Sequence, residues 1–91
     1  MTCTVRIPSQ LRALTGGLGQ VPIEAGTVGE ALDALSDAYP GVRERLFDEE
    51  GNLRRFLNVF VADEDVRFLQ GLATELEGGQ TVSILPAIAG G

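Results

Sequence analysis

Residues 27–41, TVGEALDALSDAYPG, are the most strongly marked helical segment of this chain. Thr27 stands three residues before Glu30, the spacing of a capping box, in which a hydroxyl and a carboxylate each accept a hydrogen bond from an otherwise unpaired backbone N–H. Polar residues occupy one predicted face, and Pro40-Gly41 ends the segment. The other face carries apolar residues at helical spacing: Val28, Ala31, Leu32, Leu35 and Tyr39. The pattern predicts one amphipathic helix, with Glu30, Asp33, Ser36 and Asp37 facing away from the core.

Two short strands precede this helix. Residues 3–7 alternate, which places Cys3, Val5 and Ile7 on one face and predicts a half-buried strand. Cys3 is in phase with the apolar residues, so we interpret it as a buried small side chain rather than a reactive thiol. Residues 20–23 predict a second strand, and Pro22 favours an edge position. Strands this close in sequence form a hairpin most simply.

The strands after the helix are equally short. Residues 56–61 predict a strand, 63–65 a turn, and 66–68 a brief return along that strand. Residues 81–85 alternate again, with Val82 and Ile84 on the core side. This order predicts an α+β fold in which one main helix covers one face of a mixed sheet of about four to five strands. The other face is left free as a candidate docking surface.

Residues 42–55 carry no clear period. Residues 43–47 are compatible with one helical turn, and the charged run 48–52 is typical of an exposed loop. We expect the charged run to be solvated and to need no partner.

The composition excludes most catalytic classes. The 91 residues include one Cys and no His, and all seven basic residues are Arg. A chain of this length forms one small domain. One Cys makes no internal disulfide, and the absence of His removes histidine bases and, with a single Cys, structural zinc clusters. We therefore do not expect an independent enzyme or a metal site.

Charge and hydropathy limit the partners. A net charge of −6 opposes binding to nucleic-acid phosphates and to anionic membranes. No apolar run approaches the roughly 18 residues that span a bilayer, and residues 1–6 lack the pattern of a signal peptide. We expect a cytoplasmic protein that is a monomer when free.

The end of the sequence holds the one chemically suggestive feature. Pro86 closes the last predicted strand, and an uncharged arm ends in Gly90-Gly91. Glycine has no Cβ and can thread a narrow channel to a partner's active site. A carboxylate with a pKa of about 3.3–3.7 is ionised and a poor electrophile, so its chemistry needs activation, for which an acyl phosphate made from ATP is suitable. From the residues alone, the glycines also fit a merely flexible end.

Several motifs together carry a family resemblance. They are the tail 81–91 (TVSILPAIAGG), the runs 63–68 (DEDVRF) and 71–74 (GLAT), Arg55-Phe56, Asn58, Val61, Thr15-Gly16-Gly17 and Glu44-Arg45-Leu46. The tail resembles that of the ubiquitin-like β-grasp sulfur carriers, which include the small subunit of molybdopterin synthase and the thiamine sulfur carriers. Over almost the whole chain, the sequence more closely resembles the mycobacterial sulfur carrier for cysteine biosynthesis.

The resemblance implies a β-grasp domain over residues 1–86 and a flexible tail over 87–91. It implies a non-enzymatic sulfur donor whose Gly91 is adenylated by a ubiquitin-activating-like enzyme and converted to a thiocarboxylate. A pyridoxal-phosphate-dependent cysteine synthase accepts the sulfur, and a JAMM-type zinc metallopeptidase releases the product. ATP, pyridoxal phosphate and zinc then belong to these partners, and none is bound by this chain.

The site residues follow from the same resemblance. Gly91 carries the chemistry, and Ala87, Ile88, Ala89 and Gly90 reach into the partner's active site. The predicted docking residues lie on the free sheet face and around the strand–turn–strand of residues 56–68: Phe56, Asn58, Phe60, Arg67, Phe68 and Leu85.

Two alternatives stay open. The same tail suits the small subunit of molybdopterin synthase, which donates sulfur to the precursor of the molybdenum cofactor. A non-catalytic ubiquitin-like interaction module would use the domain and leave the glycines without chemistry. Thiamine sulfur carriers are generally shorter, and the additional segment 42–55 therefore disfavours a role in thiamine synthesis.

Overall fold

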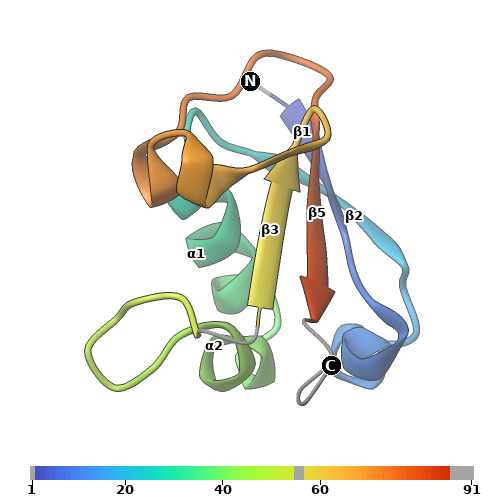
Figure 1. Ribbon diagram of the computed structural model, residues 1–91. Coiled ribbons are helices and arrows are strands. Elements are labelled where there is room, and N and C mark those ends of the chain that lie inside the picture. The colour runs from blue at the N-terminus through green and yellow to red at the C-terminus, as the bar shows by residue number, and fades with distance from the viewer. Residues whose placement is uncertain (1, 55–56, 87–91) are drawn as a thin grey trace.

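The computed structural model describes residues 2–54 and 57–86, in which five strands form a single sheet (Figure 1). The strand order across the sheet is β2-β1-β5-β3-β4. The strands are β1 (Thr2–Arg6), β2 (Gln20–Glu24), β3 (Leu57–Val61), β4 (Glu64–Asp65) and β5 (Thr81–Pro86). The first and last strands of the sequence are thus neighbours at the centre of the sheet.

The sheet is mixed because of this central pair. β1 and β5 run parallel, with Val5 opposite Val82, whereas β1–β2, β3–β5 and β3–β4 are antiparallel. The predicted hairpin of β1 and β2 is confirmed, and β2 with Pro22 lies at an edge, where the missing proline N–H costs no ladder hydrogen bond.

Helix α1 (Val28–Ala38) lies against one face of the sheet (Figure 1). Its predicted apolar stripe is buried, apart from Tyr39, which follows the helix and is half-buried. The stripe joins the inward residues of all the longer strands in one core, including Cys3, Val5, Val21, Ile23, Val28, Ala31, Leu32, Leu35, Leu57, Val59, Val61, Val82 and Ile84. The expected fold of one main helix on one face of a mixed sheet is confirmed.

The prediction that Ser36 faces solvent is wrong. Ser36 is only 2% exposed, and its hydroxyl donates to the Leu32 carbonyl oxygen at 2.8 Å. This bond satisfies the buried hydroxyl within the helix itself. A small polar side chain can therefore enter the core without an unpaired group.

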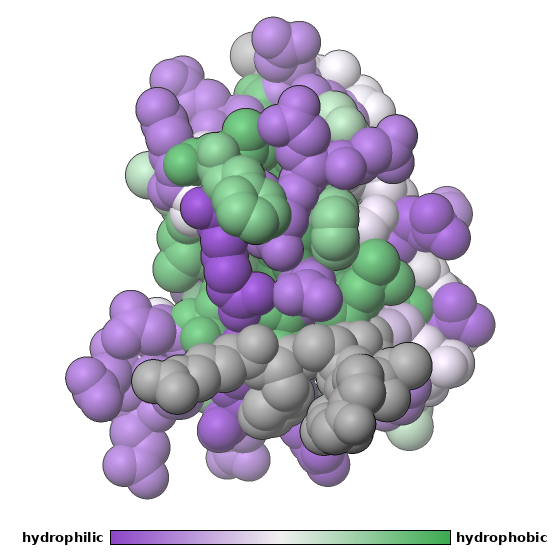
Figure 2. Space-filling model, viewed as in Figure 1, coloured by the Kyte–Doolittle hydropathy of each residue, from purple (hydrophilic) through white to green (hydrophobic). Residues whose placement is uncertain are grey.

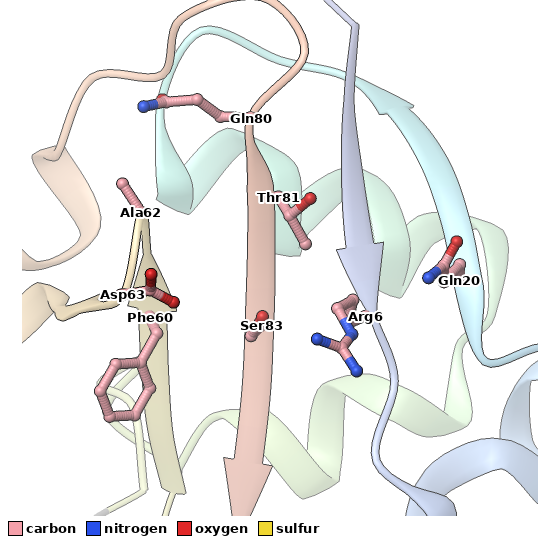
Figure 3. A pocket seen from close by; sticks show the side chains of 8 residues that line it. All are labelled: Arg6, Gln20, Phe60, Ala62, Asp63, Gln80, Thr81 and Ser83. Atoms are coloured by element: carbon pink, nitrogen blue, oxygen red, sulfur yellow. The ribbon is translucent and has the colours of Figure 1, made fainter.

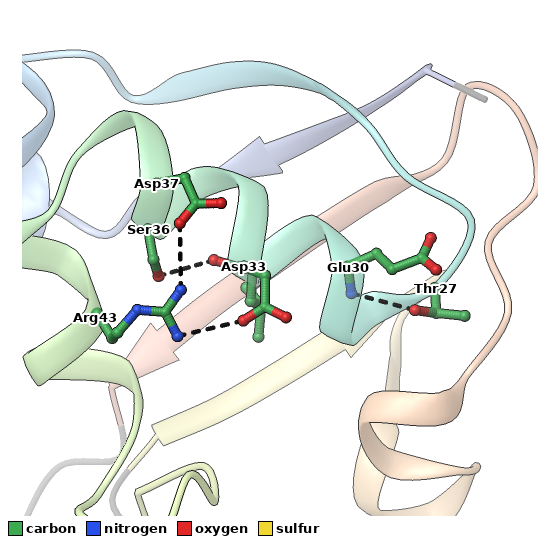
Figure 4. A network of polar contacts seen from close by, with 7 residues as sticks. Thr27, Glu30, Asp33, Ser36, Asp37 and Arg43 are labelled. Atoms are coloured by element: carbon green, nitrogen blue, oxygen red, sulfur yellow. Dashed lines mark hydrogen bonds and ion pairs between the residues drawn. The ribbon is translucent and has the colours of Figure 1, made fainter.

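The helix begins with a variant of the expected capping box (Figure 4). The Thr27 hydroxyl accepts a hydrogen bond from the Glu30 amide at 3.2 Å. The Glu30 carboxylate accepts from the Gly26 amide at 2.8 Å, one residue before the usual partner. Both carry out the expected function, which is to pair backbone N–H groups at the helix start.

Residues 41–46 form a second helix, α2 (Gly41–Leu46), where the sequence suggested at most one turn. Its buried residues Val42 and Leu46 extend the core. Arg43 lies 3.4 Å from an Asp33 carboxylate oxygen and 3.5 Å from one of Asp37, which bridges α2 to α1 (Figure 4). The charged run that follows is an exposed loop, as expected, held by Asp48, whose carboxylate accepts from two backbone amides.

Three short 3₁₀ helices complete the described chain, and none was predicted: η1 (Ser9–Thr15), η2 (Val66–Phe68) and η3 (Gly71–Ala73). The prediction of a return strand at residues 66–68 is wrong, because the strand that pairs with β3 is Glu64–Asp65. The turn before this strand is Ala62-Asp63, whose φ angles are 52° and 68°. The Asp65 carboxylate accepts from the Arg67 amide at 2.8 Å and starts η2 instead. The sharp turn lets Val66, only 1% exposed, reach the core.

The Thr27 cap is testable by substitution. We expect Thr27→Ala to lower the free energy of unfolding by about 1 kcal/mol, because the Glu30 amide loses its acceptor. Thr27→Ser keeps the hydroxyl and should retain most of the stability. Urea denaturation measures both, and an equal loss in the two variants would contradict the role of the hydroxyl.

Candidate functional site

Within residues 2–54 and 57–86, no helix covers the face of the sheet opposite α1, which faces the viewer in Figure 1. Its side chains come from every second residue of β1, β5 and β3, and the residues between them point into the core. They include Arg6, Asn58, Phe60, Ser83 and Leu85. The register places Asn58 opposite Leu85 and Phe60 opposite Ser83.

A shallow trough follows β5 along this face. One hollow of about 390 Å³ lies between Arg6 and Phe60, near the start of β5 (Figure 3). A second hollow of about 370 Å³ continues toward Leu85. Both are lined by Arg6, Phe60, Asp63 and Ser83, so we treat them as one β5 trough. Its charged lining is Arg6, Arg12 and Asp63, whereas the whole chain is acidic.

Large apolar side chains are exposed beside this trough. Leu85 is 48% exposed on the last part of β5, and Phe68 is 86% exposed on η2. Figure 2 shows apolar and polar side chains interspersed on the same side of the molecule. An exposed aromatic ring is the kind of group that a protein partner buries.

Arg67, one of the predicted docking residues, is exposed and also makes hydrogen bonds within the chain. Its guanidinium donates to the Asn58 side-chain oxygen at 2.9 Å, to the Leu57 carbonyl oxygen at 2.7 Å and to the Arg54 carbonyl oxygen at 3.2 Å. The side chain thus binds β3 from the turn that carries Phe68.

The structure brings most of the predicted docking residues together. Asn58, Phe60 and Leu85 share the free face, Arg67 contacts Asn58, and Phe68 extends from the adjoining turn. Phe56 and the tail residues, Ala87, Ile88, Ala89, Gly90 and Gly91, lie outside the described residues. Their predicted roles stay predictions.

The trough residues Arg6 and Ser83 were missed by sequence reasoning. Alternation already places each on the outward side of its strand. What it cannot reveal is that β1 and β5, more than 70 residues apart in the chain, are adjacent and hold Arg6 opposite Ser83.

The side chains themselves offer little chemistry. Cys3 is 1% exposed, and burial raises the pKa of its thiol, so the nucleophilic thiolate is disfavoured. Hydrogen bonding from Thr2 lowers the pKa of the exposed Glu24, the opposite direction to that expected for a general acid. Within residues 2–54 and 57–86, no group of three or more His, Cys, Asp or Glu side chains could hold a metal ion. No helix in the same ranges is long and apolar enough to pass through a bilayer.

The mixed sheet, its single main helix and its free face define the class of protein: a ubiquitin-like β-grasp domain. Residues 5–91 match the ThiS family, and the chain belongs to it.

Full-length relatives agree with this assignment. The chain is 48% identical over 93 residues to the sulfur carrier protein CysO of Mycobacterium tuberculosis, and the match covers 100% of both chains. The structure resembles that of a chain in the BexX/CysO complex of Amycolatopsis orientalis, with a TM-score of 0.89, 48% identity and coverage of 98% of this chain and 99% of that one. It also resembles SAMP1 of Haloferax volcanii, with a TM-score of 0.85, 26% identity and full coverage of both chains. The relatives with the higher identity are thus sulfur carriers.

The buried thiol makes a direct prediction. Because burial raises the pKa of Cys3, native protein should react with a thiol reagent about a hundredfold more slowly than unfolded protein at mildly alkaline pH. The stability that the neutral thiol contributes is present below the ordinary thiol pKa and is lost as pH rises through the folded value.

A matched control is Ser9→Cys on a Cys3→Ala background, since Ser9 is exposed on η1. That thiol should react at the same rate in folded and unfolded protein. Fast labelling of native Cys3 would contradict its assignment to the core.

Proposed function

We propose that this protein is a sulfur carrier whose Gly91 carboxylate is adenylated with ATP and then converted to a thiocarboxylate. The observation that carries the proposal is the 48% identity to CysO sulfur carriers across the full length of both chains. The sulfur serves cysteine biosynthesis through a cysteine synthase. The chain acts as a co-substrate of partner enzymes.

The chemistry of the domain supports a carrier. Its lone thiol is buried, and the full sequence has no histidine to act as a base. A carboxylate at the end of an uncharged arm supplies a reactive group without any catalytic side chain. Two terminal glycines allow close approach of a partner's backbone, because neither has a Cβ.

The partners supply the remaining chemistry. A ubiquitin-activating-like adenylyltransferase supplies the ATP site, and a sulfur donor displaces AMP from Gly91. The cysteine synthase supplies pyridoxal phosphate, and a JAMM-type metallopeptidase with zinc releases cysteine from Gly91. In this proposal the domain presents the tail, and the partners hold all of these cofactors.

The free sheet face supports docking of these partners. The β5 trough lies along the strand that leads to the tail, and Leu85 stands one residue before Pro86, where β5 ends. A partner seated on Phe60 and Leu85 therefore contacts the base of the arm that it must receive. The relative from Amycolatopsis orientalis is known in a complex with BexX, which supports a role in protein binding.

The central prediction concerns the mass of the intact protein. Incubation with a cognate activating enzyme, ATP and a sulfur source should raise it by the difference between one sulfur and one oxygen atom. Deletion of Gly91 should abolish the change and leave the fold intact, whereas Cys3→Ala should still gain the sulfur. No gain by the wild-type chain with several such enzymes would contradict the proposal.

The acceptor is identified in a second step. The thiocarboxylated protein is offered separately to a cysteine synthase and to the large subunit of molybdopterin synthase. With the synthase and its amino-acid substrate, we expect the sulfur to add to the bound aminoacrylate and to remain on the carrier in a cysteine linked to Gly91. The mass of the carrier then rises further, until the metallopeptidase hydrolyses the bond to Gly91 and releases the cysteine. Sulfur transfer only to the molybdopterin precursor would assign the alternative pathway. If cells that carry the chain without Gly91 grew like the wild type, the third hypothesis, an interaction module, would be favoured.

The docking face is tested with a matched pair of leucines. Leu85→Asp should raise the KM for the carrier in the activation reaction about tenfold, because it puts a charge into a desolvated contact. Leu18→Asp is the control, since Leu18 is 46% exposed, against 48% for Leu85, and lines neither hollow of the β5 trough. Equal effects of the two substitutions would argue against docking on this face.

A further inference from the structure

The Arg67 guanidinium donates hydrogen bonds to three residues at and just before the start of β3. It donates to carbonyl oxygens of Arg54 and Leu57, which precede and begin β3, and to the side chain of Asn58. Its own amide donates to the Asp65 carboxylate at 2.8 Å, which fixes the first turn of η2. One side chain therefore ties η2 to the start of β3.

The start of β3 lies beside the end of β5. Leu57 is opposite Pro86, and Asn58 is opposite Leu85. Pro86 is the last residue of the strand that leads to the tail. The residues that Arg67 holds are thus the strand neighbours of the base of the tail.

The other end of the connection carries Phe68. This residue directly follows Arg67, is 86% exposed and stands on a turn anchored by the buried Val66. The backbone bond from the Leu69 amide to the Val66 carbonyl, at 3.0 Å, closes the same turn. With Arg67 bound to β3, Phe68 has a fixed position relative to the end of β5.

We propose that Arg67 is a positioning residue, which holds the Phe68 turn and the base of the tail in one fixed relation. An enzyme that contacts Phe68 then receives the base of the tail, at the end of β5, at a defined distance and direction. The inference rests on the proposed function, because it assumes that Gly91 must enter a partner's active site. It assigns Arg67 a role within this chain rather than a charge contact with the partner.

The chemistry of the contact requires a guanidinium. Arginine presents several N–H donors in a planar fork, and here Nη1 and Nη2 serve acceptors on separate residues. A lysine ammonium is a single point and cannot reproduce this arrangement. A docking charge, by contrast, would be largely preserved by lysine.

The test compares Arg67→Lys and Arg67→Gln with Arg45→Gln, an exposed arginine on α2. Thiocarboxylate formation is measured at a temperature where each variant is fully folded by circular dichroism. We expect kcat to fall about tenfold or more in both Arg67 variants, because the tail is misplaced in the active site. KM should change little, in contrast to Leu85→Asp, and Arg45→Gln should behave as the wild type.

Hydrogen exchange gives a readout that does not depend on the partner. Exchange of the Leu57 and Leu69 amides should accelerate about tenfold in both Arg67 variants, because the two elements are no longer tied. Wild-type kinetics in Arg67→Lys would show that a positive charge suffices and would overturn the proposal. Unchanged exchange, or a rise in KM alone, would also overturn it.

The assay on the wild-type chain distinguishes failure of the proposed function from failure of the role of Arg67. A wild-type chain that gains no sulfur overturns the proposed function and this role together. An active wild type with an equally active Arg67→Gln overturns only the role of Arg67.

Discussion

The structure depends on burial of one sheet face beneath α1, with the parallel pair of β1 and β5 at its centre. Val5 and Val82 lie opposite each other in this pair and are both completely buried. Leu32 and Leu35 of α1 are equally buried in the same core. Full burial of one such side chain stabilises a protein by about 1.5–3 kcal/mol, so this layer supplies the main driving force of a small domain. The other elements extend this layer.

Closing one face of the sheet leaves the opposite face open for another purpose. Side chains alternate between the two faces along the longer strands, and the outward residues Arg6, Phe60 and Ser83 line the β5 trough. β5 is both a central strand of the core and the strand that leads to the tail. In the proposed function, the buried core strand is the base of an arm whose chemistry takes place in a partner enzyme. Arg67 adds a polar tie between this base and the exposed Phe68 turn.

Local patterns predicted most of this architecture, and their failures have physical causes. Thr27, the apolar stripe of α1 and the alternation of Val82 and Ile84 identified elements correctly because burial imposes its period on the sequence. Ser36 was misplaced because a hydroxyl can satisfy itself on the helix carbonyl of Leu32. Residues 66–68 were misplaced because the Asp65 side chain competes with the strand ladder and starts a turn. For the candidate site, the sequence predicted which strand residues face outward, but not which of them lie next to one another on the sheet.

The family, the main helix, the four longer strands and the glycine arm can be predicted from the order of residues, since each follows from local periodicity or from a contiguous motif. The tertiary structure alone decided which strands are neighbours, and so brought Arg6 to Ser83 and Asn58 to Leu85. It also decided that Arg67 binds the beginning of β3 rather than pointing freely into solvent. Contacts between distant segments arise from packing of the whole core, and no local pattern in the sequence encodes them.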